Sequence, residues 1–418
     1  MLRGLEGCGV TNYARHMQAF FRQEKSVCDI FALMKITKGR VGRPDTSKDV
    51  DFISFTYEER TEIVDRLNKY DLVFLFSVPP KKAFEPVQTY VEDILEKIDK
   101  PLIFINHDHH LISFSRNMRY KEAIEACDKV FCHSLQETSK GFVTWVKKHN
   151  VEAKLEKLPI FYHIPLIEDY ITLTKDGRKK TAIQPGRYSS WKRTTLYLDF
   201  HQYLKKKDFY SLAIGLERSP GFAEKLDFYK DLGWDFWTGE LPDGTWFKRP
   251  SDGAAANKNK KLLDWLAQGS MDPNKFYSIG PYGYYDGMET IKSSAFAFHC
   301  RSFARSDLDY GNNPEFQTLE CMLLSVPVIH RHFAETVTLP DTNIRLIDRD
   351  EFLIIDDGDL KPVYGQECTN GDELVEKMDA IWNDSELYEK QRRAAVDLVH
   401  NHYSTDIIIP KLVQRCLE

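Results

Sequence analysis

Leu102-Ile-Phe-Ile-Asn-His-Asp-His-His110 is the stretch that decides the fold, because an apolar run ends there directly in a polar string. The run predicts a buried strand. Similar apolar runs in the first half of the chain lie at residues 27–34, 72–77 and 129–132, and amphipathic helical patterns lie at 12–22, 57–68, 86–98, 118–126 and 135–147. This alternation predicts the α/β class, with a parallel sheet that has helices on both faces.

A second alternating series begins near residue 180. It predicts strands at 181–185, 210–215, 295–299, 325–330 and 343–347, and helices at 194–204, 222–232, 287–294, 314–324 and 371–383. Residues 154–176 are poorly periodic and read as a crossing between domains, whereas residues 385–414 are strongly helical with an interruption near Ser404. Two such halves predict two Rossmann-like domains that face a central ligand-binding cleft.

The composition is that of an ordinary globular protein, with 42% hydrophobic and 29% charged residues among 418. A net charge of −6 means that any nucleic-acid binding needs a local basic patch. The 8 cysteines form no CxxC pair, which argues against a zinc site and favours reduced thiols in a cytosolic protein. No run of about 18 apolar residues is present, so no membrane-spanning helix is expected.

Two candidate ligand-binding strings lie in the first half. Gly7, Cys8 and Gly9 precede a predicted helix, where backbone amides suit a diphosphate or a sugar, although a plain tight turn fits as well. His107 and Asp108 follow a strand, where they suit sugar hydroxyls or merely cap a loop. Neighbouring residues of an extended segment point in opposite directions, so the whole string cannot converge on one metal ion.

The second half carries three further strings. Arg187 and Lys192 follow a strand on one turn, where two cations suit a leaving diphosphate or simply face solvent. Arg218 follows the next strand, and the Ser-Pro pair after it suits a helix cap. The third string lies ahead of a predicted helix, where carboxylates suit ribose and sugar hydroxyls or complement the helix dipole; its candidates are Asn312, Glu315 and Glu320.

In this order, the strings resemble a GT-B glycosyltransferase, and more closely the DNA α-glucosyltransferase family of T-even bacteriophages. The strings that carry the resemblance are Arg3-Gly-Leu-Glu-Gly-Cys-Gly-Val-Thr11, His107-Asp-His109, Gly186-Arg187, Trp191-Lys192, Gly215-Leu-Glu-Arg-Ser-Pro220 and the glutamates 315 and 320. The resemblance spans nearly the whole chain and is weakest across the Gly/Asn/Lys-rich residues 238–274, a predicted insertion. It implies domains at 1–170 and 178–395, and a C-terminal helix at 396–418 that returns to the first domain.

The resemblance also implies an activity, which is transfer of a sugar from a UDP-sugar to 5-hydroxymethylcytosine in double-stranded DNA, with retention at the anomeric carbon. Such an enzyme would work in the host cell cytoplasm, without a membrane and without a tightly bound cofactor; a divalent metal is possible, but no motif requires one. Arg187 and Lys192 would neutralise the departing diphosphate, and Glu320 would hold the ribose. The other donor-binding residues would be Gly7, Cys8, Gly9, Arg218, Asn312 and Glu315.

On the acceptor side, His107 and Asp108 would hold the sugar or the incoming hydroxymethyl group. The target base must leave the stack to reach a cleft. Candidate phosphate contacts are the basic residues of a Gly-rich loop and of the segment after the His-Asp string, each of which could equally be an ordinary solvated cation: Lys38, Arg40, Arg43, Arg116, Arg119 and Lys121.

Three alternatives stay open. The donor could be UDP-arabinose, because a pentose differs from a hexose by one hydroxymethyl group. The acceptor could be a small carbohydrate, or the chain could bind DNA or sugar without catalysis. A glycine turn of this kind normally follows the central strand of its sheet, and only Met1 and Leu2 precede Arg3. We therefore expect the first strand of the N-terminal sheet to be missing.

Overall fold

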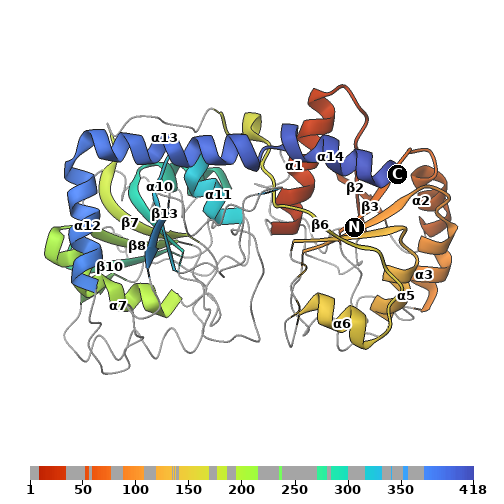
Figure 1. Ribbon diagram of the computed structural model, residues 1–418, viewed down its shortest axis with the longest axis horizontal. Helices are drawn as coiled ribbons and strands as arrows, with labels where there is room; N and C mark the ends of the chain where they lie inside the picture. Colours follow the sequence, from red (N-terminus) through yellow and green to blue (C-terminus); the bar gives the residue numbers. More distant parts are fainter. Residues whose placement is uncertain are drawn as a thin grey trace.

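The computed structural model describes residues 9–33, 52–55, 59–76, 88–107, 119–133, 135, 137, 141–168, 177–185, 194–214, 235–237, 271–279, 284–299, 316–331, 340, 352–355 and 371–418. In these ranges, every paired strand runs parallel to its neighbour, and the strands and helices form two lobes side by side (Figure 1). The α/β class is therefore confirmed. No described helix combines the length and the apolar character that a membrane-spanning helix needs.

The first lobe holds a pair of strands and a four-stranded sheet. Strand β1 (Ile30–Leu33) pairs with β2 (Phe52–Phe55), and the larger sheet has the order β3-β4-β5-β6. Its strands are β3 (Val73–Leu75), β4 (Leu102–Asn106), β5 (Lys129–Cys132) and β6 (Leu155–Lys157). The helices of this lobe are α1 (Gly9–Gln23), α2 (Arg60–Leu67), α3 (Gln88–Asp93), α5 (Arg119–Glu125) and α6 (Phe142–Lys148), with a 3-10 turn η4 (Leu95–Lys97) after α3.

The second lobe is built on a seven-stranded sheet with the order β13-β12-β11-β7-β8-β10-β9. Its strands are β7 (Lys179–Pro185), β8 (Tyr210–Ile214), β9 (Asp235–Trp237), β10 (Lys275–Ile279), β11 (Ser294–His299), β12 (Val328–Arg331) and β13 (Phe352–Ile355). The helices here are α7 (Thr194–Leu204), α10 (Tyr284–Lys292), α11 (Phe316–Leu323), α12 (Gly371–Asn383) and α13 (Ser385–His402), with a 3-10 turn η8 (Lys205–Lys207) after α7.

Side chains alternate between the two faces of each large sheet, as the two-residue period of a strand requires. In β4, Ile103 and Ile105 face α1, while Leu102 and Phe104 face the cluster that includes α5 and α6. All four are buried, which explains why the run reads as continuously apolar. The seven-stranded sheet is covered in the same way, by α10, α11 and α13 on one face and by α7 and α12 on the other.

Two segments connect the lobes. Helix α13 runs along the second lobe, breaks at Tyr403 and Ser404, and continues as α14 (Thr405–Leu417) on the first lobe (Figure 1). There Ile409 and Leu412 pack with α1 and β4. The predicted interruption near Ser404 and the predicted return of the C-terminal helix to the first lobe match these contacts.

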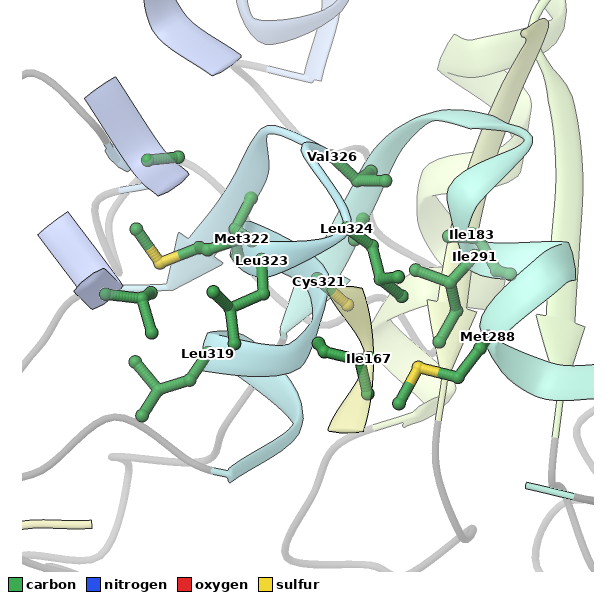
Figure 2. Packing of buried hydrophobic residues seen from close by; sticks show 14 of the residues in the cluster. Ile167, Ile183, Met288, Ile291, Leu319, Cys321, Met322, Leu323, Leu324 and Val326 are labelled. Carbon is green, nitrogen blue, oxygen red and sulfur yellow. The ribbon is translucent and has the colours of Figure 1, made fainter. Parts of the chain in front are cut away.

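The second connection is the segment after β6, which includes the 3-10 turn η5 (Ile164–Leu166). Ile167 of this segment packs into the core of the second lobe, where Figure 2 shows it below the α11 side chain Cys321. Tyr162 belongs to the same cluster. The domain boundaries at 170, 178 and 395 stay a prediction.

The sequence-based elements differ from the structure at several places. The helix expected over 135–147 begins only at Phe142, and Ser294, expected at a helix end, opens β11. Residues 154–176, expected to be irregular, contain β6. Strands β2, β9, β10 and β13 were not predicted. Three further predictions fall on residues outside the described ranges: the strand at 343–347, the helix at 222–232 and most of the insertion at 238–274. The expectation of a missing first strand concerns the residues before Arg3, which also lie outside them.

Candidate active site

His107 lies at the carboxyl end of β4, next to a second histidine at the end of β5. The parallel register pairs Asn106 with Cys132, so the residues that follow, His107 and His133, leave the same edge of the sheet together. His133 Nε2 is 3.0 Å from His107 Nδ1, and His133 Nδ1 is 2.9 Å from the carbonyl oxygen of Leu158. A row of three groups thus leads from the sheet interior to His107.

Aromatic rings fix the position of His107. The Tyr13 ring meets it edge-on with centroids 4.4 Å apart, and the Phe76 ring stacks on it at 5.7 Å. Phe161 closes the group behind Tyr13, with centroids 4.0 Å apart. Such ring pairs add about 0.5–1.5 kcal/mol each beyond the area that they bury. His107 is half-buried as a residue, and its Nε2 atom is buried.

Helix α1 brings the glycine turn to the same place. Gly9 is the first residue of α1, and Tyr13 is four residues further along. Four residues of α-helix rise about 6 Å, so the start of α1 lies about one turn from Tyr13, whose ring contacts His107. The helix N-terminus and His107 are therefore neighbours, as a shared ligand site requires. Gly7 and Cys8 lie outside the described residues.

Glu320 is the described site residue of the second lobe. It lies in α11, and only 8% of its surface is exposed. Tyr162 donates a hydrogen bond from its hydroxyl to Glu320 Oε1 at 2.8 Å. Hydrogen bonds to a charged acceptor contribute about 1.5–3 kcal/mol, so this contact holds the carboxylate in one orientation.

Tyr162 itself is held at the junction between the lobes. Its backbone amide donates to the Tyr403 carbonyl at 2.7 Å, and its carbonyl accepts from the Thr405 amide at 2.9 Å. Its ring packs on His16 of α1, with centroids 4.1 Å apart. Tyr162 thus joins α1 of the first lobe to Glu320 of the second through direct contacts.

Two buried histidines surround this junction. His16 Nδ1 accepts from the His163 amide at 3.1 Å, and His163 Nδ1 lies 2.9 Å from Thr405 Oγ1. Burial lowers the pKa of His16 well below its usual value and also lowers that of His163. Burial lowers the pKa of His133 to about 4. These three rings are neutral at physiological pH.

The end of α11 is fixed by a backbone turn at Ser325. The Val326 amide donates to the Cys321 carbonyl, and the Ser325 amide donates to that of Met322. This is the Schellman arrangement, which needs a left-handed residue, and Ser325 has φ of +59°. Helix α11 leads into β12, so its start faces the carboxyl edge of the second sheet.

The strands that precede the residues of the predicted diphosphate clamp end at that same edge. Strands β7 and β8 are neighbours, and Pro185 is paired with Ile214 at their carboxyl ends. Arg187 and Arg218 follow these two residues in the sequence, by two and four positions. The side chains of Arg187, Lys192 and Arg218 lie outside the described residues.

Among the predicted DNA-binding residues, the structure describes the side chain of Lys121. Lys121 of α5 forms an ion pair with Glu125 one turn later, with 3.5 Å between Nζ and Oε1. Arg119 begins α5, and its side chain is not among those described. The remaining predicted residues that lie outside the described ranges are Lys38, Arg40, Arg43, Asp108, Arg116, Asn312 and Glu315. Among the described residues, no group of His, Cys, Asp or Glu is arranged to hold a metal ion.

Two residues that support the site, His133 and Tyr162, were not predicted from the sequence. A signal for His133 was present, because it follows a predicted strand next to the one that ends at His107. Tyr162 had no such signal. It lies 158 residues before Glu320, in a segment without periodicity.

Comparison with known proteins identifies the family. The sequence model of the family described as "AGT: DNA alpha-glucosyltransferase" matches residues 8–237. DNA alpha-glucosyltransferase of Enterobacteria phage T4 is 22% identical over 420 aligned positions, which cover 96% of this chain and 94% of the phage protein.

Solved structures agree in fold. An alpha-glucosyltransferase in complex with UDP matches with a TM-score of 0.78 at 19% identity, covering 100% of this chain and 98% of that one. An alpha-glucosyltransferase with UDP-glucose and DNA containing an abasic site matches with a TM-score of 0.73 at 19% identity and the same coverage. The likeness shows the two-domain GT-B fold. Since the family match spans more than half of the sequence, the chain belongs to the DNA alpha-glucosyltransferase family, whose members are UDP-sugar-dependent glycosyltransferases.

Proposed function

We propose that this protein transfers glucose from UDP-glucose to 5-hydroxymethylcytosine in double-stranded DNA, with retention of configuration at the anomeric carbon. The observation that carries the donor half is the buried Glu320 carboxylate, held by Tyr162 at 2.8 Å. A carboxylate in this position suits the paired hydroxyls of a ribose. Support for the ligands comes from relatives solved with UDP, with UDP-glucose and DNA, and with a 13-mer DNA containing a HMU base.

On the donor side, Glu320 holds the ribose, and Arg187 and Lys192 hold the diphosphate. Two cations stabilise the charge that develops on the departing UDP, and Arg218 adds a third. The start of α1, with its glycine turn at Gly7, Cys8 and Gly9, offers backbone amides to the sugar phosphate. Asn312 and Glu315 bind the sugar hydroxyls.

On the acceptor side, the first lobe receives the DNA. The base swings out of the stack, and its hydroxymethyl group meets the sugar near His107 and Asp108. Phosphate contacts come from a local patch of basic side chains, so binding weakens steeply with salt despite the net charge of −6. The proposed patch consists of Lys38, Arg40, Arg43, Arg116, Arg119 and Lys121.

The chemical step is a front-face displacement. The hydroxymethyl oxygen forms a bond to the anomeric carbon as the bond from that carbon to the phosphate oxygen breaks. UDP leaves with that electron pair, and a phosphate oxygen accepts the hydroxyl proton. Attack and departure on one face retain the configuration, without a covalent intermediate on the protein.

Mass spectrometry of nucleosides tests this proposal. The protein is incubated with hydroxymethylcytosine DNA and, separately, UDP-glucose or UDP-arabinose, with cytosine DNA as control. We expect a hexosyl nucleoside from UDP-glucose alone, in the α configuration by NMR. A pentosyl product would show that the donor is wrong, and turnover of UDP-glucose without DNA would show that the acceptor is wrong.

The diphosphate clamp has its own test. We expect Lys192→Ala to lower kcat by about 10²- to 10³-fold, the usual loss when one charge-stabilising group is removed. Binding of hydroxymethylcytosine DNA to the variant, measured by fluorescence anisotropy, stays unchanged. Wild-type transfer rates in Lys192→Ala would remove this residue from the mechanism.

A further inference from the structure

The Leu158 carbonyl determines which nitrogen donates in the hydrogen bond between His133 and His107. The Leu158 carbonyl oxygen can only accept, so His133 Nδ1, 2.9 Å away, carries the hydrogen. In a neutral imidazole, the other nitrogen is then an acceptor. His133 Nε2 therefore accepts from His107 Nδ1 at 3.0 Å, and the hydrogen of His107 is on Nδ1.

This assignment requires a neutral His133, and the buried surroundings of His133 favour the neutral form. Only 4% of the residue is exposed, between β5 and the segment that follows β6. Burial lowers its pKa to about 4. A protonated His133 would have to donate from both nitrogens, so its hydrogen bond with His107 would reverse while the one to Leu158 would not.

The position of the His107 ring is fixed as well. Turning the imidazole by half a turn about its bond to Cβ would replace Nδ1 by a carbon atom opposite His133. The Tyr13 ring at 4.4 Å and the Phe76 ring at 5.7 Å confine it on two sides. The hydrogen bond to His133 selects one of the two ring orientations.

We propose that His133 is a positioning residue, which keeps the hydrogen of His107 on Nδ1 and leaves Nε2, a buried atom in the ligand-free protein, as a hydrogen-bond acceptor. Neutral His107 then cannot donate from Nε2 to the departing phosphate, and it recognises an O–H group of the sugar or of the base. The catalytic part of this inference rests on the proposed function. The tautomer itself does not.

The tautomer is measured first, on the full-length protein without ligands. Long-range ¹H–¹⁵N NMR of ¹⁵N-histidine-labelled protein distinguishes a protonated from an unprotonated ring nitrogen, and a His107→Asn sample assigns the His107 signals. We expect a protonated Nδ1 and an unprotonated Nε2 in His107. The opposite tautomer would overturn the inference whatever reaction the protein catalyses.

Kinetics on three variants then test the role. His133→Leu removes the acceptor, and we expect kcat to fall about 10- to 100-fold, as for other groups that orient a site residue, with KM for the UDP-sugar within about twofold. His133→Gln places an amide oxygen where Nε2 was, and we expect it to restore most of kcat and the wild-type tautomer. His149→Gln is the control, because His149 is the C-cap residue of α6, a helix that covers the other face of the sheet, and it leaves kcat unchanged.

Two kinetic outcomes would overturn the proposal. One is a wild-type kcat in His133→Leu together with an unchanged His107 tautomer. The other is a folded His133→Gln protein, with the wild-type tautomer, that is as slow as His133→Leu. Loss of folding in His133→Leu would leave the NMR and the His133→Gln comparison to decide. Absence of transfer to DNA by the wild-type protein would instead count against the proposed function.

Discussion

The contribution of the Tyr162 hydroxyl to donor binding can be measured by removing that one oxygen atom. Tyr162→Phe keeps the ring on His16 and removes the hydrogen bond to Glu320. We expect KM for the UDP-sugar to rise several-fold, with a smaller change in kcat, because the Glu320 carboxylate loses its fixed orientation. The free energy of unfolding falls by about 1.5–3 kcal/mol. Calorimetric titration with UDP and urea unfolding measure the two effects.

Tyr403→Phe is the matched control for this change. Tyr403 is fully buried in the same hydrophobic cluster, and its hydroxyl has no hydrogen-bond partner among the described residues. The same atom is removed, but no bond is lost, so affinity for UDP stays at the wild-type value. Equal losses in both variants would mean that the Tyr162–Glu320 contact does not matter for the donor.

Ser325 combines two unfavourable features in one residue. A non-glycine residue in the left-handed region costs about 1 kcal/mol, and its buried hydroxyl lacks a partner within the part of the chain that the structure describes. We expect Ser325→Gly to raise the free energy of unfolding by about 1–2 kcal/mol in urea. Ser325→Ala removes only the hydroxyl, so it gains less. An alanine variant more stable than the glycine variant would refute the argument from φ.

At the scale of elements, one side chain of α14 fastens this helix to the first lobe. Arg415 donates from Nε and Nη2 to Glu156 Oε2, at 2.8 and 2.6 Å, and from Nη1 to the Lys157 carbonyl. Its guanidinium also lies 4.9 Å above the Phe131 ring. The contacts tie the last helix to the edge strand β6.

Arg415→Met keeps much of the aliphatic stem and removes the charge. We expect α14 to open more often, with faster amide hydrogen exchange from residue 405 onward and a loss of about 1–2 kcal/mol. The loss is limited because the Arg415 side chain is 35% exposed. Lys390→Met on the exposed face of α13 serves as control, and equal exchange rates in the two variants would contradict the prediction.

The elements also show how far the sequence could predict this fold. Strands β4 and β5 were predicted with their observed bounds, because both faces of each are buried and the apolar run is uninterrupted. Strand β6 was missed because Leu155-Glu-Lys157 holds a single apolar residue and owes its place to β5 and Arg415. Similarly, β10 depends on β8, more than 60 residues earlier.

The candidate site follows the same rule. His107 was singled out because a strand end is a local feature, and Glu320 because it lies within a local helix. Tyr162 could not, since its role arises only where the crossing segment meets the break between α13 and α14. Contacts between residues distant in sequence carry no pattern in a single chain.

At the scale of the whole molecule, buried neutral histidines lie in both lobes and between them. Burial lowers the pKa of His133 in the first lobe and of His201 in the second, each to about 4, and also lowers the pKa of His16 and His163 at the junction. In the unfolded chain these rings titrate near pH 6.5. The unfolded state therefore binds more protons wherever the pH lies between the two values.

The sign follows from this difference. Above about pH 6.5, the histidines are neutral in both states and their contribution to stability is complete. As the pH falls from 6.5 towards 4, the histidines of the unfolded chain bind protons that those of the folded protein do not bind. The free energy of unfolding therefore decreases. A shift of the size given for His133 or His201 corresponds to about 3 kcal/mol, and two such residues already rival the total stability of an ordinary domain.

We therefore expect the protein to lose stability steeply between pH 6.5 and 4.5, measured by urea unfolding at half-unit intervals. His201→Asn removes one titrating ring while an amide group stays near Ser211, to which His201 Nδ1 is bonded at 2.7 Å. The variant starts less stable at pH 7.5, but its stability declines less with falling pH, because one proton fewer is taken up on unfolding. His400→Gln, an exposed site on α13, keeps the wild-type slope. A His201→Asn slope equal to that of the wild type would show that acid unfolding has another origin.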